Sequence, residues 1–437
     1  MKKTIVSAMF ILVAFGLNAQ DVKTAKKLYD KGDLTGAKTQ IDGFVASNAN
    51  SPEGLYLKAK IYESIASNEQ LSSSVPDAGQ TAFESFKKAM DLSKDNKEIM
   101  IEQLKDKNFY KPLLNLYADF YKSGLKDFNT GISSKKPADF QKAVNEFVMA
   151  NSVGKFATSN HLTTLGVIDT ALVLNIGQAA IYAENPEVAL SNFKTLADAN
   201  IVGTKEGNSG YQLPYEWLAQ YYRDNKDDAN FNKYVDKGKQ FFPSDKFFDL
   251  VTLDYYRNKK DYPNLFKKYD ELIVKYPDSV SYNLSYASEA FSYVYGSDEG
   301  VKIENKDQIL NTVNTSLQRS LKNDPNNVKA NWLMGQYYYN MGIETRQKAN
   351  AIKAPKLPAD VKSKADLNNT AKQYFNQAVP FLDKAMTTYE STNKKSDKSN
   401  YKSVVNLAMQ NYEQLQMPDK VKSYQQKYDS SDAKFVN

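Results

Sequence analysis

The chain has 437 residues, of which 41% are hydrophobic and 25% are charged, and its formal net charge is +6. This composition is typical of a folded protein and excludes a largely disordered one. Lysine, aspartate and glutamate are interspersed without a basic arm or stripe, so we predict no nucleic-acid partner. The chain has no cysteine and one histidine, which excludes disulfides, thiolate chemistry and a zinc site built on several imidazoles.

Residues 1–19 have the features of a secretory signal peptide. Lys2 and Lys3 precede an apolar run over 5–17, which is too short to span a bilayer but suits the apolar core of such a signal. Cleavage after Ala19 would leave Gln20 as the mature start; the alternative is that this segment forms a buried first helix. No other stretch is apolar enough for a membrane helix, and there is no cysteine for a lipid anchor. We therefore predict a periplasmic or secreted protein.

Two consecutive stretches, 212–245 and 246–279, define a helical repeat. Pro243 and Pro277 lie 34 residues apart, and each follows a segment whose apolar residues recur at helical spacing. Similar segments recur along most of the chain, which indicates stacked helical hairpins. The predicted hairpin units are 22–50, 51–94, 110–155, 170–201, 212–245, 246–279, 280–325, 328–390 and 401–430, and together they form a single domain over 20–437.

Small residues on the first helix of a unit precede a pattern of the type Ala-x-x-x-Phe-x-x-Ala on the second helix, as in Ala82, Phe86 and Ala89. The small residues let the two helices approach, and they stand at Ala59, Ala118, Gly177, Ala219 and Gly335. This pattern resembles the tetratricopeptide repeat (TPR). The resemblance implies an all-α solenoid of about nine hairpins that binds other proteins. With the leader and the Tyr/Asn/Lys-rich composition, it is similar to exported envelope proteins of Bacteroidota-type bacteria.

Four units have additional residues between their first and second helices. The small-residue positions of the two helices are 12 residues apart in three units, but they are further apart in 51–94, 110–155, 280–325 and 328–390. Insertions at one point of a repeat lie on one edge of a solenoid, so we expect a rim of lengthened hairpins that either contacts a partner or only packs on itself.

The longest insertion, in 328–390, has the most detailed prediction. Its first helix should run towards Ala351 and its second should start near Asp360, with Pro355 and Pro358 in the turn. Pro380 should kink the second helix, because proline lacks an N–H and clashes with the preceding turn. A polar loop is expected at 391–400, and a flexible turn at 202–211.

Outward-facing residues of the first helices are candidates for partner binding. Counting from the small-residue positions gives Gln220, Arg223, Asp254, Arg257, Trp332, Gln336 and Tyr339. Arg223 and Arg257 stand one repeat apart, which favours an extended peptide or a helix that carries acidic groups. The lysine and asparagine of the family's carboxylate clamp are absent, so that binding mode is not implied. The alternative is a groove filled by solvent or by the ends of the chain.

We predict no catalytic residue, no metal site and no cofactor. His161 lies in a linker without the serine and aspartate of a triad, and the glycine-rich stretch 202–211 does not match a phosphate-binding loop. The sequence thus favours a non-enzymatic scaffold that binds a protein or peptide in the cell envelope, in an oligomeric state that it leaves open.

Two other functions remain as alternatives. One is a glycan-binding helical-repeat protein of a polysaccharide uptake system, in which Trp332 and exposed tyrosines stack on sugar rings. The other is a hydrolase on an α/α toroid that uses two carboxylates, although the sequence identifies no such pair.

Overall fold

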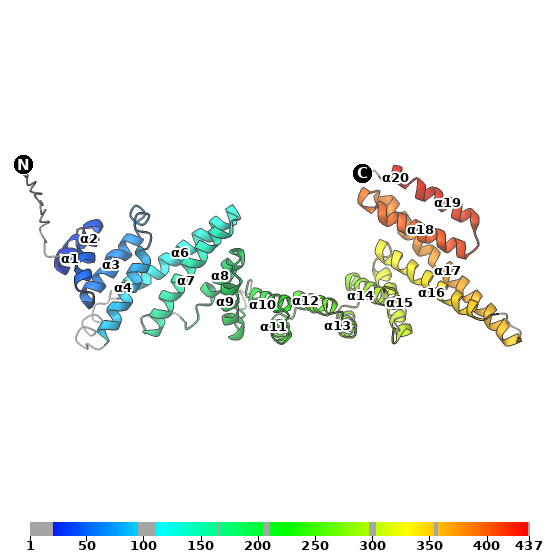
Figure 1. Cartoon of the computed structure of the whole chain (residues 1–437), viewed down its shortest axis with the longest axis horizontal. Coiled ribbons are helices and arrows are strands. Elements are labelled where there is room, and N and C mark those ends of the chain that lie inside the picture. The colour runs from blue at the N-terminus through cyan, green and yellow to red at the C-terminus, as the bar shows by residue number, and fades with distance from the viewer. Residues whose placement is uncertain are drawn as a thin grey trace, which may run out of the picture. The chain divides into compact units, whose positions relative to one another are not determined.

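The computed structural model describes residues 21–94, 110–163, 166–203, 210–296, 303–353 and 357–435 (Figure 1). Within these ranges the chain forms α-helices, one short 3-10 helix and no β-strand, which confirms the predicted all-α class. The chain divides into two compact units, Met1–Asp245 and Lys246–Asn437, and their boundary falls between the two stretches that define the 34-residue repeat. The predicted leader and most of the turn at 202–211 lie outside the described residues.

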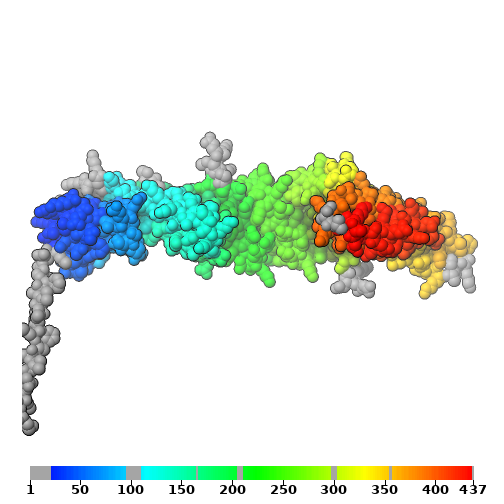
Figure 2. Space-filling view, turned by 90° about the horizontal axis from the view of Figure 1, so that it is seen from above, coloured from blue at the N-terminus to red at the C-terminus, as the bar shows by residue number. Residues whose placement is uncertain are grey.

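The first unit consists of antiparallel helical hairpins, each with a first and a second helix. The pairs are α1 (Val22–Asp30) with α2 (Leu34–Ser47), α3 (Pro52–Ala66) with α4 (Ala78–Ser93), α6 (Lys111–Ser134) with α7 (Pro137–Ser159), α8 (Thr170–Tyr182) with α9 (Pro186–Asp198), and α10 (Leu213–Asp224) with α11 (Asp228–Phe241). The hairpins follow one another in chain order, from blue through cyan to green, and neighbouring ones pack together (Figure 2).

The second unit repeats this arrangement. Its pairs are α12 (Phe247–Asn258) with α13 (Tyr262–Lys275), α14 (Val280–Tyr295) with α15 (Lys306–Asn323), α16 (Val328–Ala351) with α17 (Pro358–Thr392), and α18 (Lys398–Gln414) with α19 (Pro418–Asp429). The 3-10 helix η1 (Lys395–Asp397) joins α17 to α18, and the short α20 (Ser431–Lys434) packs on α18 and α19.

Close approach of the paired helices depends on small residues, as the repeat pattern predicts. A Cβ on Gly335 of α16 would lie 2.5 Å from Leu382 of α17, and one on Gly177 of α8 would overlap the Phe193 ring of α9. In the third hairpin the position differs from the prediction. Ala118 is only partly buried, and Gly124 instead faces the ring of Phe147.

Three short hairpins share one turn that the sequence pattern did not reveal. The second residue after the first helix has a left-handed backbone, with φ of 56° at Glu184, 58° at Lys226 and 54° at Lys260. The next residue then caps the second helix, because its side chain accepts a hydrogen bond from a backbone N–H of the first turn. These caps are Asn185, Asp227 and Asp261.

The α16–α17 hairpin agrees with the prediction for the longest insertion. The first helix ends at Ala351 and the second starts at Pro358, two residues before the expected Asp360; Pro355 lies outside the described residues. The helix α17 continues through Pro380, and the kink there stays a prediction. The predicted polar loop at 391–400 is wrong at both ends. Helical hydrogen bonding continues through Thr392 and resumes in η1 and α18, which polar side chains do not prevent on an exposed surface.

Candidate partner-binding face

The predicted partner-binding residues all stand on first helices, but the two units divide them. Gln220 and Arg223 belong to α10 in the first unit. The other five belong to the second unit, with Asp254 and Arg257 on α12 and Trp332, Gln336 and Tyr339 on α16. The structure therefore relates only these five to one another, and the expected proximity of the two arginines stays a prediction.

Arg257 is engaged by groups of its own chain. Its guanidinium donates to the carboxylates of Asp254 and of Glu289 on α14, and its Nη2 lies 3.3 Å from the hydroxyl of Tyr269. Burial alone would lower the pKa of Arg257, but the hydrogen bond and the charge of Glu289 raise it. Two carboxylates surround one guanidinium, so this part of the face is acidic. An acidic partner would have to displace an existing ion pair.

Arg223 in the first unit has a nearer partner. Its guanidinium contacts the carboxylate of the next residue, Asp224, at 2.9 Å, and its side chain is partly buried. Gln220, one turn before, is exposed.

Polar side-chain contacts join several first helices to the first helix of the next hairpin in both units. The hydrogen-bonded pairs are Tyr29–Ser64 at 3.2 Å, Glu63–Asn115 at 2.9 Å, Tyr121–Asn175 at 3.3 Å, Arg257–Glu289, and Tyr339–Gln410 at 3.4 Å. These pairs connect α1 to α3, α3 to α6, α6 to α8, α12 to α14 and α16 to α18. We call the side of each unit on which they lie the first-helix face.

Glu63 belongs to this face, and the prediction missed it. The side chain is only 7% exposed, and its carboxylate accepts a hydrogen bond from Asn115. Burial raises the pKa of Glu63, and the hydrogen bonds from Asn115 and Ser64 partly offset that effect. The signal was present in the sequence, because Glu63 stands four residues after Ala59, as Arg257 stands four after Leu253.

The aromatic members of the predicted set contribute to packing. Trp332 is partly buried against the core formed by α17, α18 and α19, and its Nε1 is buried without a hydrogen-bond acceptor among the described residues. The ring of Tyr339 lies 5.9 Å from that of Phe375, and Gln336 is partly buried. An apolar side chain that does stand out on this face is Leu250 of α12, which is 49% exposed.

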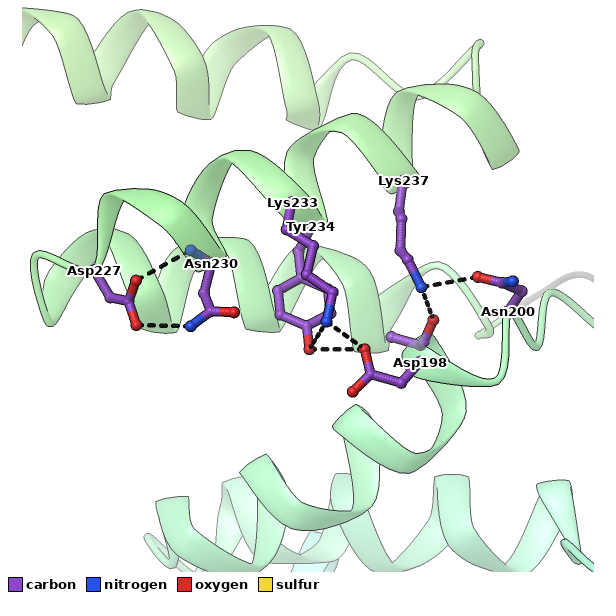
Figure 3. Close-up of polar contacts among 8 residues, drawn as sticks. Asp198, Asn200, Asp227, Asn230, Lys233, Tyr234 and Lys237 are labelled. Atoms are coloured by element: carbon purple, nitrogen blue, oxygen red, sulfur yellow. Dashed lines mark hydrogen bonds and ion pairs between the residues drawn. The ribbon is translucent and has the colours of Figure 1, made fainter.

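A second set of polar contacts joins the second helices α9 and α11 (Figure 3). Lys233 and the hydroxyl of Tyr234 reach Asp198 at 2.8 and 3.1 Å, and Lys237 donates at 2.8 Å to the carbonyl of Ala197 at the end of α9. Burial would raise the pKa of Asp198, but its bonds to Lys233 and Tyr234 lower it. All the donors already have acceptors within the chain, so this cluster holds two hairpins together.

Within the described ranges, no three His, Cys, Asp or Glu side chains are grouped closely enough to hold a metal ion. His161 is exposed in the left-handed residue that ends α7, with φ of 58°. None of the described helices is both long and apolar enough to cross a membrane.

Comparisons with known proteins do not assign the chain to a family. No protein family and no curated protein sequence matches the chain. Among solved structures, it is similar to human IFIT1 in a dimer with m7Gppp-AAAA, at 11% identity over 88% of this chain and 90% of that one, with a TM-score of 0.24. It is also similar to the P58(IPK) TPR domain, at 14% identity over 85% and 97%, with a TM-score of 0.24. A third is the Cut9–Hcn1 tetramer, at 10% identity over 92% and 95%, with a TM-score of 0.23. At TM-scores this low, nothing about a ligand of this chain follows from these structures.

Proposed function

We propose that this protein is an exported, non-enzymatic scaffold that binds a segment of another protein along its first-helix face. The observation that carries this proposal is the set of contacts that joins neighbouring first helices. Through Arg257–Glu289 and Tyr339–Gln410, the second unit presents polar and aromatic side chains of separate hairpins on one side. A surface shared by several repeats suits an extended peptide or a helix.

The charge of this face favours a different partner from the one that Arg223 and Arg257 suggested. Asp254 and Glu289 outnumber the single guanidinium between them, and Leu250 stands exposed on the same helix as Asp254. A neutral or basic segment with an apolar anchor complements such a surface better than an acidic one.

Two substitutions on one hairpin test the face. Leu250→Asp changes an exposed residue of α12, and Val274→Asp changes an 80% exposed residue of α13, the second helix of the same hairpin. We expect crosslinking in the native envelope to capture a partner with the wild type and with Val274→Asp, but not with Leu250→Asp. Circular dichroism should show that both variants keep their helices. Capture of the same partner by Leu250→Asp would overturn the proposal for this face.

The extension of the α16–α17 hairpin is the second candidate contact. Replacing 348–369 with a short turn removes its tip but retains the packing of Gly342 on Phe375. Loss of the partner from a folded variant would assign the contact to the extension. Retention would make the extension structural.

The proposed export rests on residues 1–19, which lie outside the described part of the chain. Sequencing the N-terminus of the protein recovered from the envelope should give Gln20. An intact Met1 on protein recovered from the cytosol would contradict export.

The structure gives no support to glycan binding through Trp332. That side chain packs into the core, so Trp332→Ala would reduce stability whether or not a sugar binds.

A further inference from the structure

A hollow of about 460 Å³ lies on the second-helix side of the second unit, where α13 and α15 flank α14. Side chains of α13 and of the first turns of α15 form its two walls, and α14 forms its floor. The residues around it are Tyr262, Pro263, Phe266, Lys267 and Asp270 of α13, Tyr286, Ala290 and Tyr293 of α14, and Glu304, Asn305, Gln308, Ile309 and Thr312 at α15. Its size is that of a small-molecule site, which typically has a volume of about 300–1,000 Å³.

Aromatic rings form one continuous side of this hollow. The rings of Tyr262 and Tyr293 lie 4.3 Å apart with 37° between their planes, and Phe266 meets Tyr293 edge-on at 5.5 Å. Phe266 also lies 5.8 Å from the buried ring of Tyr286. Because the rings cover one another, they leave neither a slot between two faces nor a cage around a central point. A ligand must lie against the aromatic surface.

Polar groups also line the hollow. On the floor, the hydroxyl of Tyr286 donates to Asp270 at 2.9 Å, and burial raises the pKa of Tyr286. On α15, the side chains of Gln308 and Thr312 face the hollow, and Asn305 precedes the helix in a left-handed conformation without capping it. The amide of Gln308 thus offers donors and an acceptor opposite the aromatic wall, and the carboxylate of Asp270 offers an acceptor on the same wall as the rings.

The same place in another repeat shows that packing does not require these rings. A hollow of about 420 Å³ lies over α8 between α7 and α9, and it has no aromatic lining residue. Its walls include Val148, Val188, Ser191 and Asn192. The repeat therefore tolerates small side chains between its second helices, and the aromatic wall over α14 is a local addition.

We propose that the hollow between α13 and α15 binds a neutral sugar ring of an oligosaccharide. A pyranose has an apolar C–H face that packs against one aromatic ring, and the planes of Tyr262 and Phe266 are tilted by 43°, so we assign that contact to the ring of Phe266. The hydroxyl edge of the sugar donates and accepts hydrogen bonds, which suits the amide of Gln308 as donor and acceptor and the oxygens of Thr312 and Asp270 as acceptors. Among the charged lining residues, Asp270 and Glu304 outnumber Lys267, which disfavours an anion, and the rings that pack on one another form no cage for a cation. This site lies on the second helices and does not depend on the proposed protein-binding role of the first-helix face.

The test measures binding of neutral gluco-, manno- and galacto-oligosaccharides to the full chain by calorimetry, beside a uronic-acid oligosaccharide and an unstructured peptide. Phe266→Ala removes part of the aromatic wall and Gln308→Ala removes an exposed hydrogen-bonding group. We expect one neutral oligosaccharide to bind the wild type, and each substitution to weaken its binding at least tenfold. Ser191→Ala, in the hollow over α8, is the matched control and should leave the affinity unchanged.

Gln308→Ala keeps the proposal falsifiable if Phe266→Ala reduces folding, because Gln308 is exposed. Binding of no neutral oligosaccharide, or binding that neither substitution weakens, would overturn the proposal. Binding of only the uronic-acid oligosaccharide or only the peptide would overturn the assigned ligand class.

Discussion

Glycines that face a buried aromatic ring set how closely the helices of a hairpin approach. Gly177 packs so tightly on Phe193 that a Cβ would overlap the ring, and Phe193 is fully buried. Alanine gains about 1 kcal/mol in helix propensity over glycine. Overpacking costs typically ~1–3 kcal/mol, and a Cβ that overlaps a fully buried ring belongs in the upper half of that range, so we expect Gly177→Ala to lower the free energy of unfolding by about 1–2 kcal/mol. Chemical denaturation followed by circular dichroism measures this.

Gly166→Ala is the control for this substitution. Gly166 is exposed, and a Cβ there would lie at an ordinary 3.5 Å from the nearest carbonyl oxygen. Its unfolding free energy should change by less than about 0.5 kcal/mol. A Gly177→Ala variant as stable as this control would show that the ring moves aside without cost.

Glu216 gives the chain a pH dependence of known sign. Burial, with the hydrogen bond and the charge of Asp245, raises the pKa of Glu216 from 4.5 to about 7. The folded state therefore binds this proton more tightly, and its contribution to stability is complete below pH 4.5 and is lost as the pH rises through 7. Because the side chain is partly exposed, we expect a loss of only about 1–2 kcal/mol.

Thermal or urea unfolding between pH 4.5 and 8 measures this loss. Glu216→Gln stays neutral, so its stability should fall less than that of the wild type across this range. Glu69→Gln, in an exposed turn, should follow the wild-type curve. Parallel curves for Glu216→Gln and the wild type would contradict the assignment.

At the same scale, the sequence predicted the small residues that let helices approach but not how side chains pair. Arg257 was expected to meet an acidic partner, but Glu289 from the next hairpin already engages its guanidinium. Such a pair joins residues 32 positions apart, and no spacing rule within one helix reveals it. Glu63 is the opposite case. Its place four residues after Ala59 assigns it to the first-helix face, although a glutamate is seldom buried there or elsewhere.

At the scale of elements, two junctions between consecutive hairpins each contain a buried asparagine that hydrogen-bonds the turn before it. Asn283 donates from Nδ2 to the carbonyls of Pro277 and Ser279, at 3.0 and 2.9 Å. Asn331 makes the same two bonds to Pro325 and Asn327, at 3.0 and 2.9 Å. Each asparagine stands six residues after the proline that follows a second helix, so Pro-x5-Asn is a pattern of this junction.

Alanine at either asparagine should leave two carbonyls without these donors. We expect Asn283→Ala and Asn331→Ala each to lower the free energy of unfolding by about 1–3 kcal/mol. Asn258→Ala, at the exposed end of α12, should change it by less than about 0.5 kcal/mol. Hydrogen exchange should accelerate first in the turns that contain Pro277 and Pro325. Unchanged exchange there would show that water replaces the bonds without loss.

Helices were predictable because apolar residues recur at helical spacing over many turns, as the end of α16 and the start of α17 show. Turns were less so. Lys226 and Lys260 adopt left-handed backbone conformations that glycine adopts more easily. Because no glycine stands at these positions, the sequence does not predict the turns. The prediction of a loop at 391–400 was wrong because polar residues are as common on an exposed helix as in a loop.

At the scale of the whole molecule, the chain divides between its two most regular repeats, after Asp245. In a repeat protein, each hairpin is stabilised mainly by its neighbours. A destabilising substitution therefore affects its own hairpin and the adjoining ones most strongly. Phe193 of α9 and Phe375 of α17 are both fully buried, one in each unit. Replacing either with alanine should cost about 3–5 kcal/mol locally.

Hydrogen exchange followed by mass spectrometry distinguishes local from global loss. We expect Phe193→Ala to accelerate exchange in α8, α9 and adjoining helices of the first unit, and to leave α16 to α18 near their wild-type rates. Phe375→Ala should have the reverse effect, because its ring packs between α16 and α17, on Gly342 and Tyr339. If either substitution accelerated exchange equally over the whole chain, the two units would unfold as one cooperative body. In that case a substitution in either unit would also reduce binding at the first-helix face of the other. With independent units, Leu250→Asp and Phe375→Ala can affect partner binding without altering the helices before Asp245.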